Sequence, residues 1–231
     1  MPRPRTVYTW DTKSARYRRA DNGFFIRRRD IDRLFMEFIT GGQRRAAALA
    51  NSLLARDLAV AEWQAALRDE LRHAHTVAAV TARGGWAQMT AADWGRLGAR
   101  TRGEYARLNN FAAEVTSGAQ KFNGTIRSRS GRYIRGARST YYNEQHRLLI
   151  ERQAGLSGVL LARRVYGFSV TGEKCDGCQR EHDRGWQAAD TIAEIGSQEC
   201  GHNCNCYLLY KLTGSLTEAQ VLIGTQDDGG E

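Results

Sequence analysis

Two stretches near the carboxyl end decide the fold of this chain: Cys175-Asp-Gly-Cys178 and Cys200-Gly-His-Asn-Cys204-Asn-Cys206. Together they contain all five cysteines of the 231-residue sequence. A CxxC pair followed, about twenty residues later, by a second cysteine group has the spacing of a tetrahedral zinc site, which four thiolates can complete. The sequence therefore predicts a small module that a structural zinc ion holds together.

The chain has one cysteine more than such a site needs. The predicted ligands are Cys175, Cys178, Cys200 and Cys206. Cys204 is the alternative fourth ligand, and His182 and His202 are further donors close by. Disulfides fit an odd number of cysteines poorly, and unliganded thiols would not be expected to cluster at ligand spacing. A catalytic zinc usually has His or carboxylate ligands and an open position, so a structural zinc is the favoured interpretation.

Sequences typical of β-strands flank the cysteines. One runs from Arg164 to Val170 and leads into the CxxC, and the other runs from Cys206 to Tyr210. Two strands held at one metal would form a small β-ribbon, for which Trp186 is the predicted apolar plug. Beyond residue 213 we expect a flexible tail.

Helical periodicity fills the middle of the chain. From Asp30 onward, apolar residues recur at the i, i+3, i+4 positions of an amphipathic helix. Gly41-Gly42 is expected to break or kink this first helix. Thr90 and Asp93 form a variant of the capping box at the start of a third helix. A basic loop from Gly118 to Gly131 is expected to precede a fourth helix.

The amino-terminal arm alternates aromatic and polar residues and contains Asn22-Gly23, a strong turn signal. We predict a β-hairpin over residues 7–28, which is too small to be stable alone and should lie on a surface of this chain or of a neighbouring one. The residues predicted to bind a partner are Tyr8, Trp10, Tyr17, Phe24, Arg27, Arg28 and Arg29.

These patterns predict a mainly α fold. An elongated helical body is preceded by a β-hairpin arm and followed by a small zinc-bound β-ribbon module. The predicted boundaries are residues 1–29 for the arm, 30–155 for the helical domain, 156–213 for the cysteine-rich module and 214–231 for the tail.

The net charge of +9 is unevenly distributed. Residues 1–30 carry +6 and residues 91–155 carry +7, whereas residues 156–231 carry −5. Arginines before and within the fourth helix would suit a nucleic acid, an acidic protein or simple exposure to solvent, and we favour the last two because no known DNA-reading motif is visible. These candidates are Arg127, Arg129, Arg132, Arg135 and Arg138.

Several classes of function find no support in the sequence. No apolar run approaches the roughly 20 residues of a membrane helix, so we expect no membrane contact and synthesis in a reducing cytoplasm. The chain has no GxSxG elbow, HExxH helix or phosphate-binding Gly loop, so we do not expect an enzyme. The alternative is a zinc-containing DNA-binding protein or HNH-like nuclease, with His182-Asp183 and His202-Asn203 as its candidate catalytic elements.

The order of these parts resembles the phage head morphogenesis family, the minor head (minor capsid) proteins of tailed bacteriophages. The resemblance rests on the arm around Trp10-Asp11, on helices that contain Glu62-Trp-Gln and Gly84-Gly-Trp, and on a CxxC followed by Asn203-Cys-Asn-Cys206. The family commonly has Asn-Cys-Arg-Cys in this last box, and here Asn205 replaces the arginine.

The resemblance implies a structural role. It implies a virion component that is assembled in the host cytoplasm, takes part in head and neck assembly, and is present in multiple copies in a symmetric assembly. Its expected partners are portal, capsid or neck and tail proteins. Non-specific DNA contact is a further expectation, which comes from the basic residues and not from the resemblance.

Overall fold

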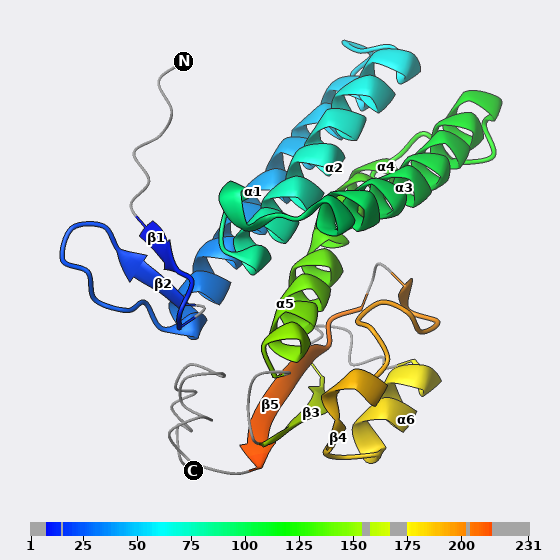
Figure 1. The fold of residues 1–231 in the computed structure, drawn as a ribbon. Coiled ribbons are helices and arrows are strands. Elements are labelled where there is room, and N and C mark those ends of the chain that lie inside the picture. The colour runs from blue at the N-terminus through cyan, green and yellow to red at the C-terminus, as the bar shows by residue number, and fades with distance from the viewer. Residues whose placement is uncertain (1–7, 15, 154–157, 167–174, 202–203, 214–231) are drawn as a thin grey trace.

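The computed structural model describes residues 8–14, 16–153, 158–166, 175–201 and 204–213. The fold is mainly helical, as predicted, with a two-stranded hairpin before the helices and a three-stranded sheet after them (Figure 1). The elements are β1 (Tyr8–Asp11), β2 (Arg16–Arg19), α1 (Arg28–Leu54), α2 (Val60–Arg83), a 3-10 turn (Trp86–Gln88), α3 (Ala91–Ser117), α4 (Thr125–Arg135), α5 (Ala137–Gln153), β3 (Val159–Val165), α6 (Asp176–Asp183), β4 (Gln187–Ala188), a second 3-10 turn (Ala189–Thr191) and β5 (Tyr207–Thr213).

The long helices pack around α2, which contacts α1, α3, α4 and α5. Their facing sides form one apolar core, in which Trp63 of α2 is fully buried and meets Phe111 of α3 edge to face. A second core lies under the carboxyl-terminal sheet and contains Leu160, Leu208 and the three buried cysteines, Cys178, Cys204 and Cys206. Helix α5 contributes to both cores, through Tyr141 to the first and Leu149 to the second.

The prediction of a break at Gly41-Gly42 is wrong, because α1 continues through both residues to Leu54. Gly42 is buried where α1 crosses α4, and a Cβ at this position would lie 2.8 Å from Cγ2 of Ile134. The glycine therefore serves close helix packing and does not end the helix.

The predicted start of α3 is confirmed. The Thr90 hydroxyl accepts the Asp93 backbone N–H at 3.2 Å, and the Asp93 carboxylate accepts the Thr90 N–H at 2.8 Å. This reciprocal pair satisfies two donors that the helix itself leaves unpaired.

The predicted loop over residues 118–131 is too long, and the fourth helix is divided in two. Helix α4 begins at Thr125, and only Gly136 separates it from α5. Ile126 and Ile134 are the fully buried apolar residues of α4. Because most other residues of α4 are serines and arginines, its sequence does not show the apolar periodicity that predicts an amphipathic helix.

The predicted hairpin is present, and it contains one turn more than expected. Strands β1 and β2 are antiparallel, with Trp10 opposite Tyr17, and the Asp11 carboxylate accepts N–H groups in the turn between them. Asn22-Gly23 makes the turn predicted there, which brings Phe25 opposite Arg18 in an isolated bridge.

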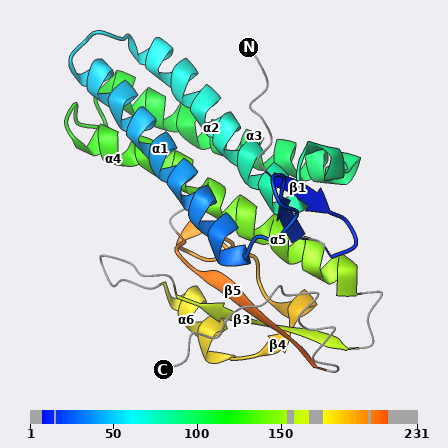
Figure 2. The same cartoon turned by 90° about the vertical axis from the view of Figure 1, so that its left-hand side faces the viewer.

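The carboxyl-terminal sheet has the antiparallel order β4-β3-β5, and α5 runs across it, as Figure 2 shows. The predicted strand from Arg164 to Val170 begins earlier, at Val159, and its residues 167–170 lie outside the described part of the chain. The prediction that Trp186 is the apolar plug of the module is wrong, since this residue is 37% exposed. The ammonium group of Lys211 lies over its ring, 4.5 Å from the centroid. The short strand β4 was not predicted.

No helix in the described part of the chain combines the length and the apolar composition that crossing a membrane requires. The tail predicted over residues 214–231 lies outside the described residues.

Candidate metal centre

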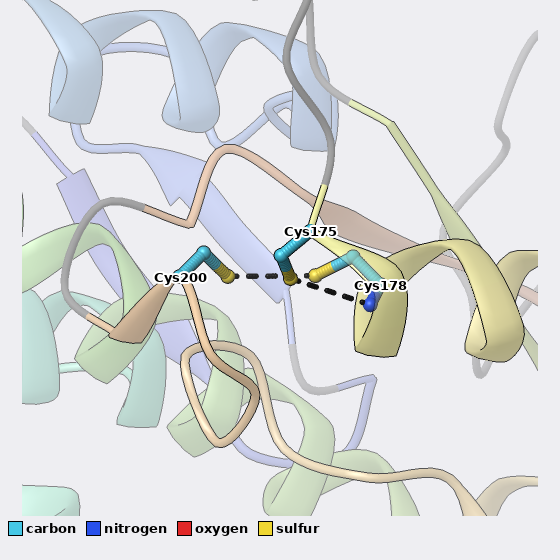
Figure 3. Close-up of side chains that lie close together, drawn as sticks. All are labelled: Cys175, Cys178 and Cys200. Atoms are coloured by element: carbon cyan, nitrogen blue, oxygen red, sulfur yellow. Dashed lines mark hydrogen bonds between the residues drawn. The ribbon is translucent and has the colours of Figure 1, made fainter.

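The cysteines reach one place from two separate segments. Cys175 is the residue that caps α6, and its sulfur accepts the backbone N–H of Cys178 at 3.4 Å, as Figure 3 shows. Cys178 lies in the first turn of α6, where the helix dipole favours a negatively charged thiolate. Cys200 lies in the loop that faces α6, and Cys204 and Cys206 lie immediately before β5.

The five sulfur atoms form two groups of three that share Cys178. Its Sγ lies 3.5 Å from Sγ of Cys200 and 3.8 Å from Sγ of Cys204. Four sulfurs bound to zinc at about 2.3 Å in a tetrahedron would be about 3.8 Å apart, whereas a disulfide would hold them at about 2.05 Å. The observed spacing fits thiolates around one metal ion.

The thiols also change one another's protonation. Hydrogen bonds from Cys178 and Cys206 lower the pKa of the Cys204 thiol to about 2. The same hydrogen bond raises the pKa of Cys178 to about 11, because Cys178 must keep its proton to donate it to Cys204, and the charge of Cys204 adds to this effect. A cation among the sulfurs would remove this conflict, since thiolate is the form that binds zinc.

Arg164 supplies a positive charge beside the cysteines. Its side chain is fully buried, and its Nη1 lies 3.7 Å from Sγ of Cys178. Its Nη2 donates to the backbone carbonyls of Ala193 and Glu194. Among the described residues no carboxylate forms an ion pair with this guanidinium. A buried charge needs a counter-charge, and four thiolates around Zn²⁺ carry a net −2. The residues present therefore fit a zinc ion.

Polar side chains of α5 fasten the cysteine module to the helical body. Asn143 donates to the Ile195 carbonyl at 3.0 Å and accepts the Ile195 N–H at 2.8 Å. Arg147 pairs with Glu194, and His146 hydrogen-bonds the buried Tyr210 hydroxyl at 2.9 Å. The loop that carries the cysteines is therefore fixed in place by α5.

His182 does not join either group of three cysteines. Its Nδ1 lies 3.0 Å from the Arg164 carbonyl, and its ring stacks on Tyr166. Among the described residues, the only sets of three that would hold a metal are the two cysteine groups. His202 and Asn203 lie outside these residues, so the nuclease alternative stays a prediction that no observation here favours.

The residues predicted to bind a partner divide into two sets. Trp10 and Tyr17 hold the arm on this chain's own body: the Tyr17 hydroxyl donates to the Thr81 carbonyl at 2.7 Å. The Trp10 ring lies so close to Gly84, the left-handed residue that ends α2, that a Cβ there would be 2.2 Å from it. Arg28 is half-buried and donates to Gln145 of α5.

The other set lines a groove of about 460 Å³ between the arm and α1. Phe24 is 72% exposed, and Phe25 and Leu34 are each 36% exposed. Tyr8 and Arg27, two of the predicted residues, also line this groove. Arg29 is exposed but does not line it.

The five predicted basic residues also differ from one another. Arg129 is neutralised, because it pairs with Glu114 at 2.6 Å and lies over the Phe111 ring. Arg127 and Arg132 are exposed, Arg135 is half-buried, and none of these three forms an ion pair among the described residues. Arg138 donates to Asn205, between the last two cysteines.

Comparisons with protein-family models, with curated proteins and with solved structures found no match. The sequence pointed to the cysteines through their spacing, but it gave no sign of Arg164 or Asn143. An arginine or asparagine acquires such a role only through contacts that the fold creates.

Proposed function

We propose that this chain is a structural protein of a tailed bacteriophage, which acts in head and neck assembly by binding other virion proteins. The observation that carries this proposal is the groove of the arm, where Phe24, Phe25 and Leu34 are exposed together. Grouped apolar side chains with a polar rim are typical of protein interfaces. The resemblance in the order of parts supports the choice of virion proteins as the partners.

The groove has the anatomy of a docking site. Phe24, Phe25 and Leu34 provide apolar surface, and Arg19, Arg27 and Arg33 form its rim. Arg18 lies over the Phe25 ring at 3.7 Å, which holds that ring in place before any partner arrives. A surface that is already ordered loses less entropy on binding.

Zinc in this proposal has an architectural role. Cys175, Cys178 and Cys200 would supply three ligands, and the fourth would be Cys204 or Cys206, which form the second sulfur group with Cys178. The ion would join α6 to the start of β5. The hydrogen bonds between Asn143 of α5 and the Ile195 backbone would then fix the joined module to the helical body.

Coexpression with the portal and major capsid proteins of the same phage tests the proposed function. We expect the full chain to retain one of them through washes at about 1 M salt, where the Debye length is about 3 Å and charge attraction is largely screened. The double variant F24A/L34A should lose most of this capture, because each truncation removes apolar contact area from the groove.

The variant F122A is the matched control, since Phe122 is 47% exposed but lies in the loop between α3 and α4, away from the groove. It should bind as the unchanged chain does. Retention of neither virion protein, or equal retention by the F24A/L34A variant, would rule the proposal out.

A further inference from the structure

The arginines of α4 and α5 form a row that the proposed assembly role does not use. Arg132, Arg135 and Arg138 are three residues apart, and Gly136 between the helices keeps helical backbone angles of φ −56° and ψ −24°. Residues three apart on a helix are neighbours on its surface. Burial, followed by the charges of Arg138 and Arg132, lowers the pKa of Arg135, so the three guanidinium groups lie close enough to repel one another.

A fourth arginine extends the row. Burial, followed by the charge of Asp32, raises the pKa of Tyr142, whereas the charges of Arg138 and Arg28 act in the opposite direction, so both arginines lie near this tyrosine of α5. Arg28 of α1 donates to Gln145 at 2.6 Å. From Arg132 to Gln145 the row covers about 20 Å at the rise of an α-helix.

The charge of this row is not balanced within the described part of the chain. None of the four arginines forms an ion pair there, whereas most other arginines of the body do: Arg96, Arg107, Arg129 and Arg147 each contact a carboxylate. Asp32, whose charge acts on Tyr142 together with those of Arg138 and Arg28, accepts the Tyr141 hydroxyl. Arginines kept together in spite of their repulsion indicate an anionic ligand.

The surroundings of the row decide between an acidic protein and a nucleic acid. Among the described residues, none of the exposed large apolar side chains belongs to α4 or α5. A protein interface needs an apolar centre, whereas the phosphate backbone of DNA needs only charge and hydrogen-bond donors. Arginine also presents a planar fork that matches phosphate oxygens.

We propose that the row Arg132, Arg135, Arg138 and Arg28 binds the phosphate backbone of double-stranded DNA without regard to sequence. The ligand is a linear polyanion, and the row is linear as well. Arg138 also contacts Asn205, so the row is fixed to the loop that carries the last two cysteines. This activity is independent of the groove formed by the arm and α1.

The test is the binding of a short labelled duplex of mixed sequence to the full chain, followed by fluorescence anisotropy from about 50 to 200 mM salt. Each phosphate contact contributes about −0.9 to the slope of log K against log salt, so four arginines predict a slope of about −3.6. The variant R132Q/R135Q should reduce the magnitude of that slope by about 2 and weaken binding to every duplex sequence alike.

Two further variants make the result decisive. R132K/R135K keeps the charge and should keep most of the binding. R72Q/R102Q removes two exposed arginines of α2 and α3 and should leave the slope unchanged, although its net charge falls by the same amount. Circular dichroism would check that each variant is folded. Absence of binding by the unchanged chain, or equal loss in R132Q/R135Q and R72Q/R102Q, would overturn the proposal.

Discussion

At the scale of single residues, two side chains that can carry a charge are fully buried in the described structure, where apolar residues would be expected. Arg164 is fully buried beside Cys178, and His75 is fully buried between α2 and α5, where its Nδ1 lies 2.8 Å from the Thr140 hydroxyl. Each is a group whose charged form is costly to bury. Arg164 is positioned to be balanced by a metal–thiolate cluster, whereas His75 is held neutral.

His75 should make the stability of the protein depend on pH. Burial, assisted by the charge of Arg100, lowers the pKa of His75 to about 3, compared with about 6.5 in an unfolded chain. Between these values the unfolded state binds more protons, so stability is full above about pH 6.5 and falls as the pH drops toward 3, by at most about 1.4 kcal/mol per unit.

Urea unfolding at a series of pH values from about 4.5 to 7.5 measures this effect. The variant H75Q should be less stable near neutral pH and should show a flatter slope. H73Q on the exposed side of the same helix is the control, and its slope should match that of the unchanged chain. An unaltered slope in H75Q would contradict the assignment.

At the scale of elements, the sequence predicted those helices whose apolar residues recur regularly. Helix α1 has buried residues at 31, 35, 39, 42, 46, 50 and 53, which is the expected stripe. Helix α4 was missed in part because Ile126 and Ile134 are almost alone among polar residues. Its helical form depends on packing against α1, which no local pattern reveals.

The two adjacent glycines of α1 test this view of helix packing. A Cβ at Gly41 would meet only the end of the Arg45 side chain at 3.7 Å, so G41A should stabilise the protein by about 0.5–1 kcal/mol through helix propensity. A Cβ at Gly42 would lie 2.8 Å from Ile134, so overpacking of about 1–3 kcal/mol should outweigh that gain in G42A.

Urea unfolding of both variants gives the answer, since each serves as the other's control. We expect the free energy of unfolding to rise in G41A and to fall in G42A, relative to the unchanged chain. Stabilisation of similar size in G41A and G42A would show that α1 and α4 are less closely packed than described here.

At the scale of the whole molecule, two cores share one helix. Tyr141 of α5 stacks on Phe35 in the helical body, and Leu149 packs under the carboxyl-terminal sheet. The overall order of arm, helical body and cysteine module was visible in the sequence, because composition and periodicity change at each boundary. The way in which Asn143 and Arg147 join body and module was not, because it depends on residues about 50 positions apart.

The central claim is that the cysteines of α6 and of the segment before β5 hold one metal ion. Native mass spectrometry of the full chain, purified without chelator, measures it directly. We predict one zinc ion per chain, lost in C178S because Cys178 belongs to both sulfur groups. A folded chain without metal, in which all five thiols react freely with a thiol reagent, would contradict the account.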